Sequence, residues 1–318
     1  MIGRRSFVAS AGFTLAGILL QSRVAKAQGL LSTQTPESKS FNTSGILPVE
    51  IRLTPSIAWD FDAFGNRYSL DKVNNLLTKY VEGKVQWQIG GSNVNDFRRL
   101  NLPSSVVTDR QGRVYVTDLG NSRVLILSES KGQLINVIRS TRRKRLNSPQ
   151  DLAVANGKIY VADTLSHEID IYTVNGRHVT TFGTHGNLYN QLNGPTSIAV
   201  ADNSDIFVVD NGNFGIKVFS QSGVLLDIFD DKKLDGIKNF RPSYITMGPE
   251  GILYAADSIA GRVIVMTQKG RVLDVIELIQ DDGSRAQPRY LGISPNGSLV
   301  VSAFTALPQF QQKSVITN

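Results

Sequence analysis

The pentapeptide "VYVTD" at residues 114–118 returns three times downstream, as "IYVAD" (159–163), "IFVVD" (206–210) and "LYAAD" (253–257). Each copy lies in a unit that starts with a proline, passes through an apolar segment and a polar turn, and ends in the aspartate. The clear units start at Pro103, Pro149, Pro195 and Pro242, and weaker ones at Pro55 and Pro288. The prolines are separated by 48, 46, 46, 47 and 46 residues. Such regular spacing indicates a repeat architecture.

Each unit predicts four short strands. In the second unit "SVVTD" and "VYVTD" are separated by a turn with Gly112, and "RVLILSE" and "QLINVI" by a turn with Gly132. These sheets are apolar on both faces, so both faces need cover, which packing around a common axis supplies. The fold class that follows is all-β: a six-bladed β-propeller of four-stranded antiparallel blades.

The last unit is too short for a full blade. After "SLVVSAF" (298–304) the remaining chain has room for one more strand. We therefore expect the N-terminal strand "LPVEIRL" (47–53) to close the last blade, and the propeller domain to span residues 46–318.

The order of proline, apolar strand, glycine turn, "hYVAD" and "RVhhh" resembles the NHL repeat. Its clearest copy is "LNLPSSVVTDRQGRVYVTDLGNSRVLIL" at 100–127, and the resemblance extends over about residues 50–318. It implies a propeller. Members of the family serve in protein and RNA recognition and in extracellular sensing, and similar propellers include lyases and lactonases, so the fold alone does not choose a function.

The N-terminus differs in kind from the repeats. Residues 1–27 have the charged, apolar and small-residue order of an export signal, with Arg4 and Arg5 first and Ala25 and Ala27 at the cleavage site. The arginine pair resembles the twin-arginine signal, although Gly3 and Ala9 depart from its pattern. We expect residues 28–45 to form a flexible leader and the protein to be periplasmic or otherwise exported, soluble after cleavage. Retention of the signal as a membrane anchor is the alternative.

Composition restricts the function further. The chain has no cysteine, which excludes a disulfide framework and a thiol nucleophile. The formal net charge is +7, and removal of the signal with its four cations and no acid would leave +3. The mature protein is thus only mildly basic, and only a local cluster could attract an anionic partner.

The repeated residues are best explained by blade construction. Asp118, Asp163, Asp210 and Asp257 each end a second strand, where a carboxylate can accept backbone N–H groups. We therefore look for function where the units differ.

The links between units differ most in charge. The link at 139–148 holds Arg142, Arg143, Lys144 and Arg145 and no acid, and the preceding link holds Arg98 and Arg99. This cluster predicts a surface for an anionic partner: a protein, an anionic glycan or a lipid headgroup. Nucleic acid is disfavoured because the chain is exported and no aromatic residues interleave the cations. The alternative is a solvated loop without a partner.

The channel mouth is the second candidate. The two residues after each proline should line it, and they include Asp151, Tyr244, Arg289 and Tyr290, which the blades do not require. Two aromatic rings beside a cation and an acid predict a small ligand pocket. The alternative is that these groups only hydrate the channel.

No catalytic signature is present. The three histidines lie in one unit and its outgoing link, there is no GxSxG motif, and the calcium-like spacing from Asp60 to Asp71 follows from the repeat. We therefore predict no catalytic residue, metal or cofactor, and a monomeric, non-catalytic recognition or scaffold module. The alternatives are a periplasmic metal-dependent lyase or lactonase-like hydrolase that uses the channel mouth, and a purely structural subunit of a larger assembly.

Overall fold

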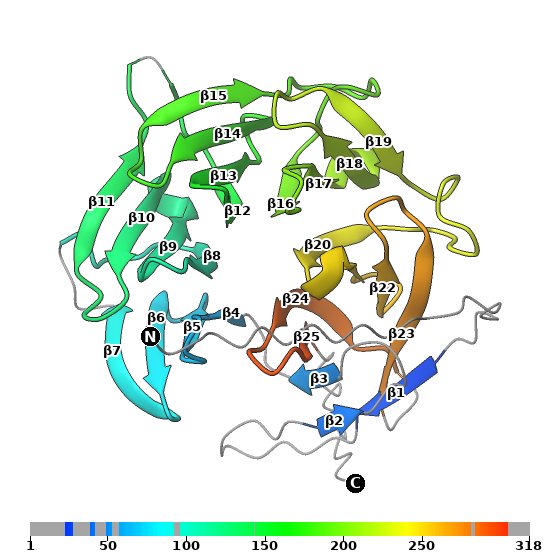
Figure 1. The fold of residues 1–318 in the computed structure, drawn as a ribbon, viewed down its shortest axis with the longest axis horizontal. Helices are drawn as coiled ribbons and strands as arrows, with labels where there is room; N and C mark the ends of the chain where they lie inside the picture. The colour runs from blue at the N-terminus through cyan, green and yellow to red at the C-terminus, as the bar shows by residue number, and fades with distance from the viewer. Residues whose placement is uncertain are drawn as a thin grey trace, which may run out of the picture.

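The fold is a ring of β-sheets around a central axis (Figure 1). It is taken from a computed structural model, which describes residues 23–27, 39–41, 49–52, 57–91, 96–142, 144–280 and 284–304. Arg4, Arg5 and Arg143 lie outside these residues. Among the described residues no helix has the length and apolar character needed to cross a membrane.

Five sheets follow the units of the sequence, and their strands run antiparallel in chain order. The first blade has β4 (Ile57–Phe61), β5 (Arg67–Asp71), β6 (Leu76–Val81) and β7 (Lys84–Gly90). The second has β8 (Pro103–Thr108), β9 (Arg113–Asp118), the 3-10 turn η1 (Leu119–Asn121), β10 (Arg123–Ser128) and β11 (Leu134–Arg139). The third has β12 (Pro149–Ala155), β13 (Lys158–Asp163), β14 (Glu168–Thr173) and β15 (His178–Phe182).

The fourth and fifth blades repeat this plan. The fourth has β16 (Pro195–Val200), β17 (Ile206–Asp210), η2 (Asn211–Asn213), β18 (Gly215–Phe219) and β19 (Leu225–Phe229). The fifth has β20 (Pro242–Met247), η3 (Pro249–Gly251), β21 (Leu253–Asp257), β22 (Arg262–Met266) and β23 (Val272–Gln280). On its outer edge β1 (Arg23–Ala27) pairs with β23 in parallel, and this strand contains the predicted cleavage-site residues Ala25 and Ala27.

The prediction of six four-stranded antiparallel blades is wrong, because only five blades are of that kind. The remaining sheet has the order β2–β3–β25–β24 and mixed strand direction. Its C-terminal strands β24 (Gln287–Ile293) and β25 (Leu299–Phe304) are antiparallel. The N-terminal strand β3 (Val49–Arg52) pairs with β25 in parallel, and β2 (Lys39–Phe41), within the predicted leader, adds to β3. A strand supplied by the other end of the chain is not bound by a hairpin turn to the antiparallel direction.

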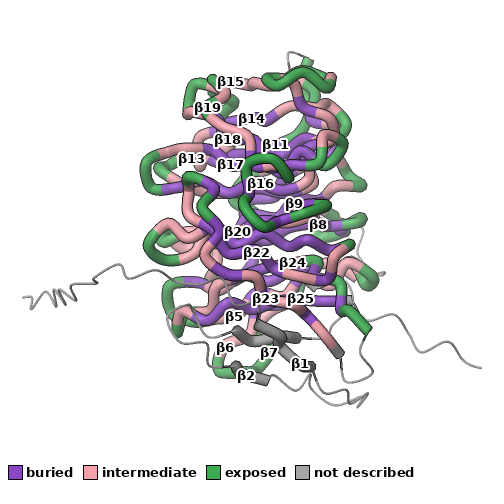
Figure 2. The backbone as a smooth tube through the Cα atoms, turned by 90° about the vertical axis from the view of Figure 1, so that its right-hand side faces the viewer, coloured by how far each residue is buried: buried purple, intermediate pink, exposed green. Residues whose placement is uncertain are grey.

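The ring closes through its inner strands, which contact one another in the order β4, β8, β12, β16, β20, β24 and β4 again. Each apolar core lies between two neighbouring sheets. Tyr68 and Leu77 of the first blade, for example, pack in one cluster with Leu125 of the second. Figure 2 shows the buried residues in the middle of the strands and the exposed residues at the turns. Face-to-face packing thus covers both surfaces of a blade, as the apolar strands require.

In the second, third and fourth blades the repeated aspartate accepts a backbone N–H from the preceding link, whereas Asp257 accepts the Ala260 N–H of the turn that follows it. Asp118 is fully buried, and its Oδ1 accepts the backbone N–H of Asn101 at 2.7 Å from the preceding link. Its Oδ2 accepts the side chains of Asn121 at 2.8 Å and Arg123 at 2.7 Å. Every bond to this carboxylate therefore joins separate segments of the same blade.

We predict that Asp118→Ala will lower the free energy of unfolding by about 3–5 kcal/mol, because it leaves the Arg123 guanidinium and the Asn101 N–H without their buried acceptor. Urea unfolding measures the change. Asp202→Ala removes an exposed carboxylate and should alter stability by less than about 0.5 kcal/mol. Equal effects of the two substitutions would contradict the anchoring role.

Candidate functional site

One end of the ring carries the links, whose charge differs most between the blades. In each antiparallel blade the incoming link, the connection between the second and third strands, and the outgoing link lie at the same end. We call this end the link face. The hairpin turns that join the first to the second strand and the third to the fourth lie at the opposite end.

A bulge after the proline shapes the channel mouth. The strand register shifts directly after Pro103, Pro149, Pro195, Pro242 and Pro288. The residue after each proline is thereby released from the ladder. These five residues line one cavity of about 230 Å³, namely Ser104, Gln150, Thr196, Ser243 and Arg289, together with Asn211, Tyr244 and Tyr290. The structure thus brings Tyr244, Arg289 and Tyr290 together, as the sequence suggests.

Asp151 does not line this cavity. It is 2% exposed, and its Oδ2 accepts the Ser197 hydroxyl at 2.7 Å and the Ile198 N–H at 3.0 Å. Burial raises the pKa of the Asp151 carboxyl, and the hydrogen bonds act in the opposite direction. Asp151 therefore joins the inner strands of the third and fourth blades.

The two tyrosines form the aromatic wall of the mouth. Their ring centroids are 5.4 Å apart at an interplanar angle of 72°, an edge-to-face contact. Burial raises the pKa of both phenols, for Tyr244 well above its usual range. Both hydroxyls are consequently neutral at physiological pH and can donate hydrogen bonds.

Lys72 is a charged residue that the sequence analysis missed; it contacts Tyr290, which lines the mouth, without itself lining the cavity. Its Nζ lies 4.3 Å from the centroid of the Tyr290 ring. Burial lowers the pKa of this ammonium to about 8, and the Asp151 carboxylate acts in the opposite direction. The sequence does contain an indication of this residue. Lys72 directly follows the aspartate that ends the second strand, and the residues at the same position in the other units are Leu119, Thr164, Asn211 and Ser258. Comparison of these positions finds one cation among neutral residues.

Asp60 is a second, partly buried carboxyl group on an inner strand. Its Oδ2 accepts the Thr108 N–H at 2.6 Å and the Thr108 hydroxyl at 2.8 Å, so it joins β4 to β8. Burial raises the pKa of Asp60 to about 6, the Thr108 hydrogen bonds lower it, and the negative charge of Asp62 raises it further.

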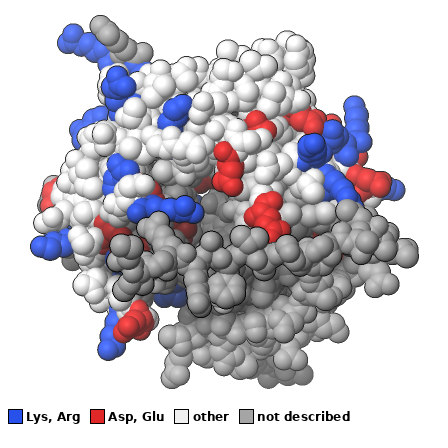
Figure 3. All heavy atoms as spheres, viewed as in Figure 1, with Lys and Arg blue, Asp and Glu red and all other residues white. Residues whose placement is uncertain are grey.

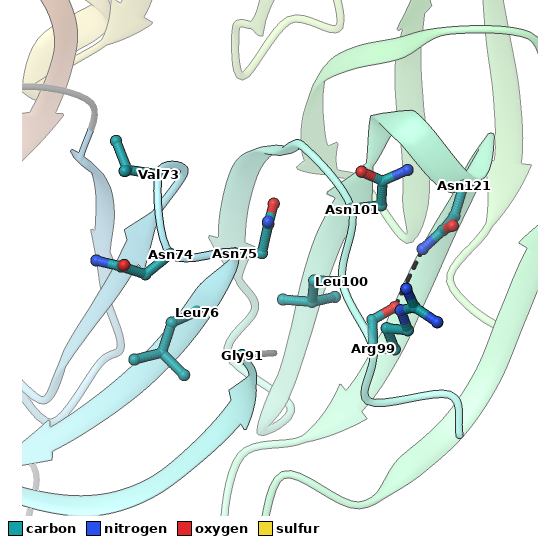
Figure 4. A pocket seen from close by; sticks show the side chains of 9 residues that line it. All are labelled: Val73, Asn74, Asn75, Leu76, Gly91, Arg99, Leu100, Asn101 and Asn121. Carbon is teal, nitrogen blue, oxygen red and sulfur yellow. Dashed lines mark hydrogen bonds between the residues drawn. The ribbon is translucent and has the colours of Figure 1, made fainter. Parts of the chain in front are cut away.

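A larger pocket of about 650 Å³ opens between the first two blades on the link face (Figure 4). Its polar lining consists of Asn74, Asn75, Asn101, Asn121 and Arg99; Val73, Leu76, Gly91 and Leu100 complete it. The Asn121 amide donates to the Arg99 carbonyl at 3.1 Å, the bond drawn in Figure 4. The Asn75 side-chain oxygen accepts the Leu102 N–H at 2.7 Å. These bonds fix the amides of two blades around one opening.

The predicted basic cluster is divided by the structure. The Lys144 ammonium pairs with Glu168 at 2.5 Å and with the buried Asp170 at 2.8 Å. Arg98 pairs with Asp96 at 2.7 Å on the surface. Arg99, Arg142 and Arg145 are exposed and make no ion pair within the described ranges. In Figure 3 the described Lys and Arg side chains form separate groups rather than one continuous patch.

The histidines make local contacts. The rings of His167 and His185 are 4.1 Å apart, and the His167 Nδ1 accepts the Gly194 N–H at 2.9 Å. Within the part of the chain that the structure describes, no three His, Cys, Asp or Glu side chains are grouped to hold a metal ion.

Comparisons with known proteins identify an NHL repeat at residues 100–127, the copy that the sequence analysis finds clearest. Protein brain tumor of Drosophila melanogaster is 32% identical over 132 residues, which is 41% of this chain and 12% of that protein. NHL repeat-containing protein 2 of Gallus gallus is 35% identical over 80 residues, or 22% of this chain and 11% of that protein. The matches thus span only a small part of both relatives.

Two solved structures show the same fold at low sequence identity. A catalytically inactive virginiamycin B lyase from Staphylococcus aureus, solved with quinupristin, has a TM-score of 0.58 at 14% identity, covering 81% of this chain and 78% of that one. A chain of a nidogen/laminin complex has a TM-score of 0.59 at 16% identity, covering 80% and 89%. At this identity the likeness establishes the architecture and leaves the function to the residues of the site.

We predict that Lys144→Ala will lower the free energy of unfolding by about 2–3 kcal/mol, because it leaves the buried Asp170 carboxylate without its ion pair. The neighbouring exposed Arg145→Ala should change stability by less than about 0.5 kcal/mol. Urea unfolding of both variants tests the assignment. If Lys144→Ala is as stable as Arg145→Ala, the ion pair with Asp170 does not stabilise the fold, and Lys144 would again be a candidate for partner binding.

We predict a pH-dependent contribution from Asp60. Because its folded pKa of about 6 lies above the ordinary value of 3.8, protonation favours the folded state. Its stabilising contribution is therefore complete below about pH 4 and is lost as the pH rises through about 6, by roughly 1–3 kcal/mol. Asp60→Asn keeps an acceptor for Thr108 and does not titrate. Urea unfolding at pH 4 and pH 7 should show that the variant gains stability relative to the parent. Parallel curves would contradict the raised pKa.

Proposed function

We propose that the protein is an exported, monomeric, non-catalytic recognition module that binds an acidic segment of a partner protein. The binding surface is the link face of the first three blades, which comprises the pocket between the first two blades and the exposed side chains of Arg99, Arg142 and Arg145. Export through a twin-arginine signal with Arg4 and Arg5 is part of the proposal. It places the partner in the periplasm or an equivalent compartment.

The amide lining of the pocket is the observation that carries this proposal. Asn74 and Asn121 donate their amide nitrogens to Asp71 at 2.7 Å and Asp118 at 2.8 Å. Their amide oxygens are thereby held in fixed positions and can accept N–H groups of an incoming chain. Asn75 uses its oxygen for Leu102, so its nitrogen can donate. Fixed donors and acceptors around one opening suit a peptide backbone, which offers both.

Charge selects an acidic partner. Arg99 belongs to the pocket, and Arg142 and Arg145 lie on the next link of the same face. An arginine without an internal ion pair has its five N–H donors available for a carboxylate. The exposed position of these cations favours steering and rapid encounter rather than high affinity by itself. A solved structure of similar fold is part of a nidogen/laminin complex, which supports protein recognition as a use of this architecture.

We predict that Arg99→Glu will weaken partner binding at least about tenfold, or roughly 1.4 kcal/mol, because it places like charge in the pocket. The partner is first captured from the envelope fraction with the tagged full chain, then purified and titrated directly by calorimetry. Binding should also weaken with added salt, as expected for exposed charges.

Arg110→Glu is the matched control. It reverses an equally exposed arginine of the second blade, on the turn between β8 and β9 at the opposite face. The proposal requires that this variant bind the purified partner as the parent does. Equal loss in both variants would indicate an effect of net charge alone. A partner that binds both variants normally, or a chain that captures no protein, would overturn the proposal.

A further inference from the structure

We propose that the channel mouth is a second binding site, for a small carboxylate that carries a flat apolar body. The site comprises Lys72, Arg289, Tyr244, Tyr290 and Gln150. It shares no residue with the protein-binding surface proposed above, so either proposal can fail while the other stands.

The ammonium of Lys72 is the first group that could bind a carboxylate. Within the described ranges it makes no ion pair, and its ammonium lies against the Tyr290 ring at 4.3 Å. Its lowered pKa of about 8 reflects burial that nothing in the site fully offsets. At neutral pH it still carries its charge, and a bound carboxylate would supply the charge-assisted hydrogen bonds that water no longer provides.

Arg289 adds a second cation at the same cavity. It is exposed and follows the bulged Pro288, and one guanidinium nitrogen donates to the Gln287 side chain at 3.1 Å. That bond orients the guanidinium and leaves its other N–H groups for a ligand. The serine hydroxyls of the wall are already used: Ser104 bonds Thr117 at 2.8 Å, and Ser243 bonds Ser258 at 2.5 Å. Charge recognition therefore falls to Lys72 and Arg289.

The tyrosines define the rest of the ligand. Both rings line the cavity in an edge-to-face pair, so a flat apolar group can pack against them. The cavity of about 230 Å³ is smaller than the roughly 300–1,000 Å³ of sites for drug-sized ligands. The ligand is accordingly of the size of a single ring with its carboxylate.

The acidic groups nearby do not favour a cationic ligand. Asp151 is buried behind the cavity, with one oxygen committed to Ser197 and Ile198. Its other oxygen, Oδ1, has no hydrogen-bond partner among the described atoms. This oxygen could attract a cation, but Asp151 is buried and does not line the cavity, whereas the cation Arg289 does.

Three probes of similar shape test the charge rule on the full-length chain: benzoate, benzamide and benzylammonium. Calorimetry or NMR titration should show that benzoate saturates the site by about 10 mM, which corresponds to a weak fragment. Benzamide should bind at least tenfold more weakly, and benzylammonium not at all. Preference for benzylammonium would assign the site to cations through Asp151. Equal binding of benzamide, or no binding of benzoate, would overturn the proposal.

Substitutions test whether benzoate binds at the channel mouth. Lys72→Met keeps an unbranched side chain against Tyr290 and should weaken benzoate at least tenfold, whereas Lys84→Met, on the opposite face of the same blade, should not. Arg289→Gln changes an exposed side chain and tests the site if Lys72→Met folds poorly. For the parent, affinity should fall roughly tenfold from pH 7 to pH 9.5 as Lys72 deprotonates. Burial raises the pKa of Tyr244 and Tyr290, so both phenols keep their protons over that range, and a flat profile would also contradict the proposal.

Discussion

The buried carboxylate at the end of the second strand is the constraint on which the link face depends. In the second, third and fourth blades Asp118, Asp163 and Asp210 are fully buried, and each accepts a backbone N–H from the link before its blade. A buried carboxylate is stable only when its lone pairs are satisfied, so these bonds leave the link little freedom. In the link before the fifth blade the anchoring carboxylate belongs to the link itself: Asp231 accepts the N–H groups of Asn239 and Phe240.

This anchoring explains how the links can vary without loss of the ring. Once a carboxylate fixes the last residues of a link, the preceding residues need only span the distance between blades. The bulge after the proline acts similarly at the channel, because it frees one residue per inner strand from the ladder. The links and the mouth can therefore differ between blades while the inner strands keep their packing. The repeated aspartates support the site, and the asparagines three residues after them, Asn74 and Asn121, line its pocket.

The sequence predicts the repeated part of this arrangement well and the rest poorly, for identifiable reasons. The proline period locates the inner strands and, from Pro103 on, the residue after each proline that lines the mouth, but it wrongly places the buried Asp151 there. It cannot give the direction of β3, because no hairpin turn relates that strand to β25. The run of basic residues at 142–145 suggests that Lys144 is an exposed cation of the link, whereas the structure pairs it with Glu168 and Asp170. The partner that neutralises it, Asp170, lies on the third strand of the next blade, and that contact exists only after the blades pack. A run of basic residues is defined by neighbours in the sequence, whereas the acid that neutralises one of them can be distant in the sequence and close only in the folded protein.

The charged groups near the axis differ in their partners. Arg289 lines the mouth and Lys72 contacts Tyr290, whereas Asp60 lies on β4 and Asp151 on β12, each bonded to the neighbouring inner strand. Burial disfavours the charged form of Lys72, Asp60 and Asp151 alike, as their pKa directions show. The acids relieve that cost through hydrogen bonds to the neighbouring inner strand, so their chemistry serves the ring. Within the described residues Lys72 has no equivalent bond from the blades, and this difference from the two acids is the reason that we propose a bound carboxylate as its partner.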